Sequence, residues 1–273
     1  MSISVKKQPI DWQNPDPQWM EVAGKRLEAR VWGPPPAQAM TIVMLHEGLG
    51  AVSLWRDFPA ALSAATGCGV LAYSRAGYGQ SDGAALPWPL DYMTREALDV
   101  LPHVLDQAGV RRAVLLGHSD GASIAAIHAG RVRDVRVCGL CLMAPHFFTE
   151  ETGLASIRAA RKAWEGGDLG RRLGRYHRDA ENAFLGWNGA WLDPGFRSWN
   201  IEDVIGGISV PVLAIQGRDD QYGSLAQIEA LKARLATPPR VQIFEACRHS
   251  PYLDQPGRTT AALVKFMDDL AEN

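Results

Sequence analysis

The sequence predicts an α/β protein with a mostly parallel twisted sheet that is flanked by helices. Two observations carry this prediction. Short apolar, β-branched runs alternate with longer amphipathic runs along most of the chain, which is typical of repeated strand and helix units. The alternation stops over residues 146–207 and then resumes. We therefore expect one α/β core, residues 1–145 and 208–273, that is interrupted by a helical insertion.

The core elements follow from the local pattern. Residues 20–32 form two alternating runs around Ala23-Gly24-Lys25, which predicts a hairpin, and Pro34-Pro35-Pro36 makes a stiff connector after it. Compact apolar runs predict strands over 41–48, 69–77, 113–119, 137–145, 211–217 and 241–247. Amphipathic runs between them predict helices over 53–66, 94–108, 120–130, 224–236 and 258–270.

Composition excludes several classes of function. The chain has 273 residues, 47% hydrophobic content and a formal net charge of −2, which gives no electrostatic reason to expect nucleic acid as a partner. No apolar run approaches the roughly 18 residues of a membrane span. The N-terminal stretch lacks the apolar segment of a secretory signal, so the cytoplasm is the expected location. The oligomeric state is not readable from the sequence.

Cys138 and Cys141 form a C-x-x-C pattern, which raises the alternatives of a redox motif or a zinc site. No second pair completes a zinc site. The pattern lies in an apolar run, where a spacing of three is expected to send the two side chains to opposite faces of a strand. We therefore expect core thiols and no metal.

The segment Gly117-His118-Ser119-Asp120-Gly121 lies where an expected strand meets an expected helix. A reversal this tight strains the backbone of its central residue and requires very small neighbours, which the two glycines supply. The pattern predicts that Ser119 is a nucleophile. The alternative is that Ser119 only caps the following helix.

A serine nucleophile needs a base and a group that orients the base. His249 follows the last expected strand, and Asp219 and Asp220 follow the strand before it. The carboxyl ends of these strands are where open α/β sheets bind their ligands. The base is therefore expected to be His249, and the orienting acid to be one of the two aspartates.

Five segments together resemble the α/β-hydrolase fold superfamily over essentially the whole chain. They are HEGLG (46–50), SRAGYGQSD (74–82), GHSDG (117–121), GRDD (217–220) and RHSPYLDQP (248–256). The resemblance implies the order nucleophile, acid, base and selects Asp220 as the acid. It also implies that residues 146–207, inserted after the sixth core strand, form a helical cap over the site.

The resemblance further implies an oxyanion hole made of two backbone N–H groups. One belongs to Asp120, which follows the nucleophile, and the other to Gly48, with Leu49 as the alternate. Glu47 replaces the glycine that usually follows the first histidine of this loop. The Asp120 side chain is expected to turn away from the oxyanion, toward the first-turn amides of its helix.

The function that these features predict is a serine hydrolase of the carboxylesterase type, acting on an ester or thioester of a small, partly apolar substrate without a cofactor. The expected substrate contacts are Leu49, His146, Phe147, Phe184, Trp187, Trp191 and Tyr222. A cofactor-free hydrolase of carbon–carbon bonds and a perhydrolase use the same three residues and remain alternatives. A binding protein of the same fold is a third.

Other histidines are expected to play structural parts. His46 is expected to brace its loop by hydrogen bonds and His118 to pack beneath the loop. His103, His128 and His177 are expected to lie on helices without a partner motif.

Overall fold

The computed structural model describes residues 9–272. Part of the N-terminal stretch that lacks a signal-like segment, residues 1–8, lies outside the described residues. Within the described part of the chain, no helix is both long enough and apolar enough to span a membrane.

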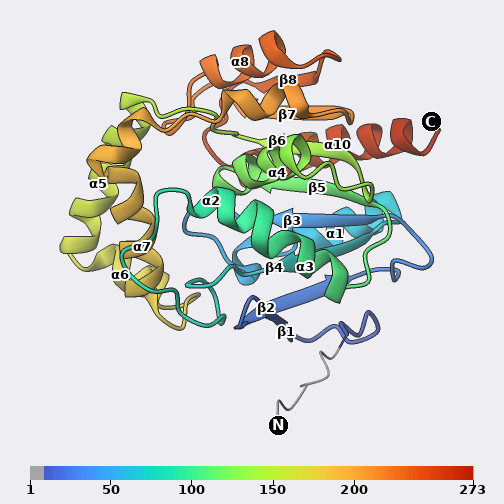
Figure 1. The fold of residues 1–273 in the computed structure, drawn as a ribbon, viewed down its shortest axis with the longest axis horizontal. Helices are drawn as coiled ribbons and strands as arrows, with labels where there is room; N and C mark the ends of the chain where they lie inside the picture. Colours follow the sequence, from blue (N-terminus) through green and yellow to red (C-terminus); the bar gives the residue numbers. More distant parts are fainter. Residues whose placement is uncertain (1–8, 273) are drawn as a thin grey trace.

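A single eight-stranded sheet forms the centre of the molecule (Figure 1). Its order is β1-β2-β4-β3-β5-β6-β7-β8. The strands are β1 (Gln18–Val22), β2 (Lys25–Trp32), β3 (Thr41–Leu45), β4 (Gly69–Tyr73), β5 (Ala113–His118), β6 (Val137–Met143), β7 (Val212–Gly217) and β8 (Arg240–Phe244). β1 and β2 pair antiparallel, as do β2 and β4, and the remaining pairs are parallel. The predicted fold class is confirmed.

Helices cover both faces of this sheet. They are α1 (Phe58–Thr66), α2 (Tyr92–Arg95), α3 (Leu101–Gln107), α4 (Asp120–Arg131), α8 (Ala226–Arg234), α9 (Pro251–Asp254) and α10 (Pro256–Ala271), with the short helices η1 (Val52–Trp55) and η2 (Glu96–Val100). Alternate residues of β3 belong to different hydrophobic clusters: Val43 to the one that includes residues of α3 and α4, and Met44 to the one that includes residues of α1 and α10. This two-sided burial explains why the central strands are apolar throughout.

The predicted elements are present, and the six strands from β3 to β8 are shorter than the apolar runs suggested. β3 stops at Leu45 and β4 stops at Tyr73, because the residues that follow form loops at the carboxyl edge of the sheet. The helix expected over 53–66 is split into η1 and α1. Arg56 between them has a φ of 54°, which no α-helix accommodates, and Pro59 lies in the first turn of α1.

The two cysteines of the C-x-x-C pattern lie on the same side of β6, so the expectation of opposite faces was wrong. The pairing with β5 runs from Ala113–Val137 directly to Val114–Gly139, which leaves Cys138 as an extra residue in a bulge. The extra residue shifts the alternation by one. Cys141 is therefore buried in the same cluster against which Cys138 packs. Both are free thiols.

Residues 146–207, called the helical insertion below, connect β6 to β7. They contain α5 (Glu151–Glu165), α6 (Asp168–Leu173), α7 (Ala180–Leu192), η3 (Pro194–Ser198) and η4 (Glu202–Gly207). A β-bridge between Phe148 and Asn200 joins the two ends of the segment. Figure 1 shows α5, α6 and α7 beside one edge of the layered core.

The strand order places a crevice at the carboxyl ends of β3 and β5. The chain passes from β3 to β4 on one side, and β5 then pairs with the other side of β3. The connections leave on opposite sides of such a point, and open α/β sheets bind their ligands there. The segments after β3 and β5 are residues 46–50, called the β3 loop below, and the turn that holds Ser119.

Candidate active site

Ser119 lies on a sharp turn between β5 and α4. Its φ of 55° and ψ of −119° are far from the values that a serine prefers, and such a conformation costs about 1–3 kcal/mol. The side chain makes no capping hydrogen bond to α4, so the structure gives no support to the alternative in which Ser119 only caps this helix. The strain instead holds the hydroxyl above the helix, where it lines a cavity.

The two glycines of the turn are required by close backbone contacts. A Cβ on Gly117 would collide with the carbonyl oxygen of Gly121, and a Cβ on Gly121 would collide with the carbonyl oxygen of Leu45 in β3. The turn therefore packs directly on the next strand. This is the physical basis of the spacing that singled out Ser119 in the sequence.

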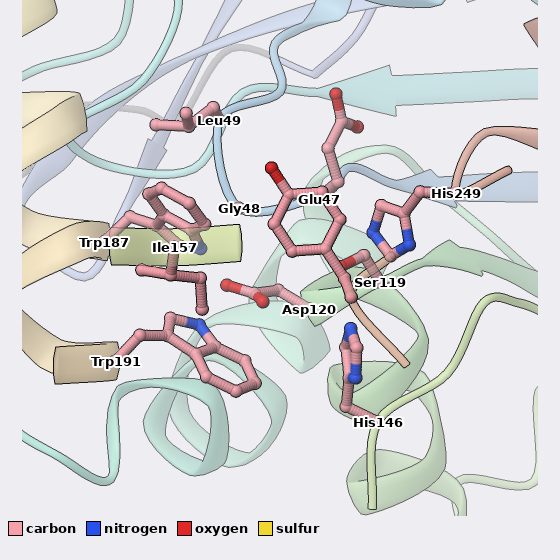
Figure 2. Close-up of a pocket in the computed structure, with 11 residues that line it drawn as sticks. Glu47, Gly48, Leu49, Ser119, Asp120, His146, Ile157, Trp187, Trp191 and His249 are labelled. Atoms are coloured by element: carbon pink, nitrogen blue, oxygen red, sulfur yellow. The ribbon is translucent and has the colours of Figure 1, made fainter. Parts of the chain in front are cut away.

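His249 and Asp220 come together from the loops after β8 and β7. Nδ1 of His249 lies 2.9 Å from each carboxylate oxygen of Asp220. His249 and Ser119 line the same cavity and lie next to each other in Figure 2. Asp219, the other aspartate considered from the sequence, is exposed.

The Asp220 carboxylate is held by donors on every side. Its Oδ1 accepts hydrogen bonds from the backbone N–H of Tyr222 at 2.8 Å and of Gly223 at 3.3 Å, and its Oδ2 accepts one from Nε2 of Gln216 at 2.8 Å. Burial alone would raise the pKa of Asp220, but the hydrogen bond and charge of His249 lower it below its usual value. Asp220 is thus an ionised group that fixes the His249 ring.

The β3 loop is braced by a buried arginine that the sequence argument did not single out. Arg75, just after β4, donates from Nη1 to the carbonyl oxygen of His46 at 2.5 Å and from Nη2 to that of Glu47 at 3.1 Å. Its backbone N–H donates to Nε2 of His46 at 3.1 Å. Nδ1 of His46 lies 2.7 Å from the carbonyl oxygen of Glu47. His46 therefore braces the loop, as expected. Its position in SRAGYGQSD (74–82), directly after a strand that ends at the site, could have marked Arg75 as a residue of the site.

His118 and Glu47 connect the β3 loop to the loop of His249. Nε2 of His118 lies 2.7 Å from the carbonyl oxygen of His249, and Nδ1 lies 3.4 Å from Oε2 of Glu47. Burial alone would lower the pKa of His118, but Glu47 raises it above its usual value. Burial would likewise raise the pKa of Glu47, and the hydrogen bond and charge of His118 lower it to about 2. Both ring nitrogens of His118 face acceptors, so we assign it as an imidazolium.

The cavity beside Ser119 is small, about 100 Å³, and is mostly apolar. Five of the expected substrate contacts line it, namely Leu49, His146, Trp187, Trp191 and Tyr222. Glu47, Gly48, Asp120 and Ile157 complete the wall together with Ser119 and His249. Figure 2 shows how Ile157, Trp187 and Trp191 of the helical insertion close one side of it.

Two expected substrate contacts lie elsewhere. Phe147 is fully buried in the core, where its backbone N–H donates to Oε1 of Gln227 at 2.7 Å. Phe184 stacks on Trp164 with ring centroids 4.4 Å apart and holds α5 against α7. The expectation for these two residues does not match the structure, because an aromatic residue of the insertion packs its own helices as readily as it lines a cavity.

Trp187 joins the helical insertion to the β3 loop. Its indole lies directly on Gly48, so that a Cβ at this glycine would overlap Nε1 of Trp187. The residue expected to supply the second oxyanion donor is therefore covered by a side chain of α7. Glycine is needed at position 48 for this close approach.

The Asp120 side chain has a different partner from the one expected. Its Oδ2 accepts a hydrogen bond from the Tyr92 hydroxyl at 2.5 Å, instead of bonding the first-turn amides of α4. The Tyr92 oxygen in turn accepts the N–H of Trp191 at 3.0 Å. Burial raises the pKa of Asp120 above its usual value, although the charge of Arg75 and the hydrogen bonds act in the opposite direction. Figure 2 shows the carboxyl group turned into the cavity.

His146 and His177 are further neutral histidines near the cavity. Burial lowers the pKa of His146 to about 3, and its ring stands edge-on to Trp191 with centroids 5.4 Å apart. His177 was expected on a helix, but it lies in the turn between α6 and α7. Its Nδ1 accepts the backbone N–H of Gly79 at 2.9 Å, and its Nε2 donates to the carbonyl oxygen of Leu49 at 3.1 Å. It ties the insertion to the β3 loop.

Comparison with known proteins agrees with the architecture. Residues 42–263 match the model of the alpha/beta hydrolase family, and the chain belongs to that family. It is accordingly classed as a hydrolase. No match was found among curated proteins.

Solved structures of similar fold include several hydrolases. A membrane phospholipase A, described as a bacterial virulence factor, superposes with a TM-score of 0.77 at 20% identity, over 94% of this chain and 87% of the other. The enol-lactonase from Burkholderia xenovorans LB400 superposes with a TM-score of 0.71 at 21% identity, over 92% of this chain and 100% of the other. The esterase RhEst1 from Rhodococcus sp. ECU1013 superposes with a TM-score of 0.70 at 17% identity, over 93% of this chain and 99% of the other. At these identities the likeness establishes the fold alone.

Proposed function

We propose that this protein is a serine hydrolase that cleaves an ester-type bond, a carboxylester or a thioester, of a small and partly apolar substrate. The observation that carries the proposal is that His249, whose Nδ1 lies 2.9 Å from the Asp220 carboxylate, lines the same cavity as the strained Ser119. The similar structures described as an esterase, an enol-lactonase and a phospholipase A favour an ester-type bond for this chain as well.

In the proposed first step, Nε2 of His249 takes the hydroxyl proton of Ser119 while the serine oxygen attacks the carbonyl carbon. Asp220 accepts from Nδ1 of His249, so that Nε2 is the free base, and it stabilises the imidazolium that forms. The intermediate collapses, and the leaving alcohol or thiol takes its proton from His249. A water molecule then attacks the acyl-enzyme by the same route and releases the carboxylic acid and Ser119.

The negative oxygen of the intermediate would be stabilised by the backbone N–H groups of Asp120 and Gly48. Asp120 begins α4, where the helix dipole favours negative charge. Arg75 holds the carbonyl oxygens of His46 and Glu47, and so fixes the peptide plane next to Gly48. Each such donor is generally worth about 100- to 1000-fold in turnover.

Residues 146–207 would act as a cap that shapes the acyl pocket. Ile157, Trp187 and Trp191 from this segment line the cavity that holds Ser119. The small and mostly apolar cavity supports a small acyl group, since a long chain would find no room there without movement of the insertion.

The test is covalent labelling by a fluorophosphonate probe, followed by turnover of p-nitrophenyl esters of graded chain length and of a thioester. The native protein is expected to label at one site, Ser119→Ala to lose the label, and Ser198→Ala, which changes an exposed serine of η3, to keep it. Short esters are expected to be cleaved faster than long ones. Undiminished labelling of Ser119→Ala would refute the assignment of the nucleophile.

A further inference from the structure

The Asp120 side chain places a carboxyl group in the cavity for which the proposed reaction has no use. The reaction needs only the backbone N–H of this residue, and a carboxylate so close to a developing oxyanion opposes its formation. The residue is 1% exposed and lines the cavity with Ser119. A buried carboxyl group in such a place calls for a partner.

Of the two carboxyl oxygens of Asp120, Oδ2 accepts the hydrogen bond of Tyr92 and Oδ1 faces the question of a partner. Because the Tyr92 oxygen accepts the N–H of Trp191, the hydroxyl hydrogen of Tyr92 is directed to Oδ2 of Asp120. The Trp191 N–H lies close enough to the Asp120 carboxyl group to lower its pKa, but it donates its hydrogen bond to the Tyr92 oxygen. Among the described residues 9–272, Oδ1 has no other hydrogen-bond donor. The chain of Trp191, Tyr92 and Asp120 thus fixes the carboxyl and leaves Oδ1 for a ligand.

The surroundings suit a cation better than an anion or a neutral donor. Among the described residues that line the cavity there is no lysine or arginine. The charge of Arg75 lowers the pKa of Asp120, but the guanidinium donates its hydrogen bonds to backbone carbonyl groups of the β3 loop. Burial keeps His146 neutral, with its pKa near 3, so it does not repel a cation. The aromatic rings of Trp187, Trp191 and Tyr222 stand around the space, and aromatic faces attract ammonium groups.

The geometry also decides which part of the substrate meets Asp120. His249 delivers its proton to the leaving group, so the leaving group lies on the His249 side of Ser119. In Figure 2 the Asp120 carboxyl group lies on the other side of Ser119, toward Trp191. The acyl part of the substrate therefore extends toward Asp120.

We infer that the acyl group carries a primary ammonium, which Oδ1 of Asp120 binds, so that the substrate class is a small amino-acyl ester. This inference rests on the proposed function for the position of the acyl group. It gives the carboxylate beside the oxyanion a purpose, because the bound ammonium neutralises it while Ser119 reacts. Asp120 is then a specificity-determining residue through its side chain.

The first experiment measures binding without chemistry. Ser119→Ala protein is titrated by calorimetry with 3-aminopropanamide and with butanamide, which replaces the ammonium by a methyl group of similar size. The amine is expected to bind about 10- to 100-fold more tightly, as a charge-assisted hydrogen bond in a buried site allows. The additional change Asp120→Asn, which keeps the shape and an acceptor for Tyr92, is expected to abolish the difference.

The second experiment compares kcat/KM for the p-nitrophenyl esters of 3-aminopropanoate and butanoate. The protein with native Asp120 is expected to prefer the amino ester by about 10-fold or more. Asp120→Asn is expected to remove this preference, whereas Asp219→Asn, which removes one exposed charge outside the cavity, is expected to keep it.

The outcomes separate the two proposals. Equal binding of the two amides, or a preference for the amine that survives Asp120→Asn, overturns the inference, and cleavage of the butanoate ester would still support the serine hydrolase. Preferential binding of the amine that depends on Asp120, together with no cleavage of either ester, supports the ammonium site and contradicts the proposed function.

Discussion

The buried His118 and the partly exposed Glu47 of the β3 loop form an ion pair, with Nδ1 of His118 3.4 Å from Oε2 of Glu47. The other ring nitrogen of His118 contacts the carbonyl oxygen of His249 at 2.7 Å. The pair therefore links the loop of the expected oxyanion donor to the loop of the expected base. Glu47 stands where the family usually has glycine, and its contact with His118 gives this departure a structural role.

Glu47→Gln is expected to lower the free energy of unfolding at neutral pH by about 1–3 kcal/mol, because it leaves a buried imidazole without its ionic partner. The pKa of His118 is raised in the folded protein. The stabilisation from the pair is thus complete below the unfolded pKa of histidine and is lost as the pH rises through the raised value. It is also lost as the pH falls toward about 2, where Glu47 becomes protonated.

Urea denaturation of the native and Glu47→Gln proteins between pH 5 and pH 9 checks this prediction. The difference between their free energies of unfolding is expected to shrink at the alkaline end. A difference that grows with pH would contradict the ion pair.

Asp220→Asn is expected to reduce kcat/KM for a p-nitrophenyl ester by about 10⁴-fold, because asparagine would favour the wrong tautomer of His249. The variant is expected to fold, since the amide can still accept from the backbone N–H of Tyr222. Steady-state kinetics beside the exposed control Asp219→Asn measures the effect. Equal losses in the two variants would be incompatible with Asp220 as the orienting acid.

Gly121→Ala and Gly189→Ala are the same chemical change with opposite expected effects. A methyl group at Gly121 would collide with the Leu45 carbonyl oxygen, whereas a methyl group at Gly189, exposed on α7, meets nothing within 4 Å. We expect the first to lower the free energy of unfolding by more than about 3 kcal/mol, and the second to raise it by about 0.5–1 kcal/mol. Thermal denaturation compares them, and a stable Gly121→Ala protein would refute the packing argument.

His177→Ala is expected to weaken the tie between the helical insertion and the β3 loop. It leaves the Gly79 N–H and the Leu49 carbonyl group without their partner, at a cost of about 1–3 kcal/mol for each group. His177→Gln can accept from one and donate to the other, so it is expected to restore most of the stability and of kcat. Equal behaviour of the two variants would show that the hydrogen bonds are unimportant.

The same histidine gives a pH dependence of its own. Burial lowers the pKa of His177 in the folded protein, so the unfolded chain takes up the proton first as the pH falls. This contribution to stability is present above the unfolded pKa and declines as the pH drops below it, and His177→Gln is expected to remove that decline. A comparison of unfolding curves at pH 7 and pH 5 measures it.

The order of the core elements could be predicted because the alternation of apolar and amphipathic runs is local in the sequence. The close approach at Gly117 and Gly121 also left a local trace, in the spacing around Ser119. Cys138 shows the limit of such patterns: the bulge in β6 depends on pairing with β5, and a single extra residue reverses the expected faces.

Side-chain partners distant in the chain could not be predicted. His177 bonds to Gly79 and Leu49, which are 98 and 128 positions away, and no motif marks the contact. Asp120 was expected to satisfy its own helix, but Tyr92 from another helix reaches it. Phe184 and Trp187 lie on the same helix with similar chemistry, and only their positions on α7 decide that one packs on Trp164 and the other on Gly48.

The contact of Trp187 with Gly48 makes this insertion a poor module for exchange. A chimera that received residues 146–207 from another hydrolase would lose the indole that covers Gly48, and the β3 loop would then face solvent or an unmatched side chain. Such a graft would need a tryptophan at the equivalent place on its helix to be active. In this protein, replacing the insertion would therefore change substrate selectivity and catalytic rate at the same time.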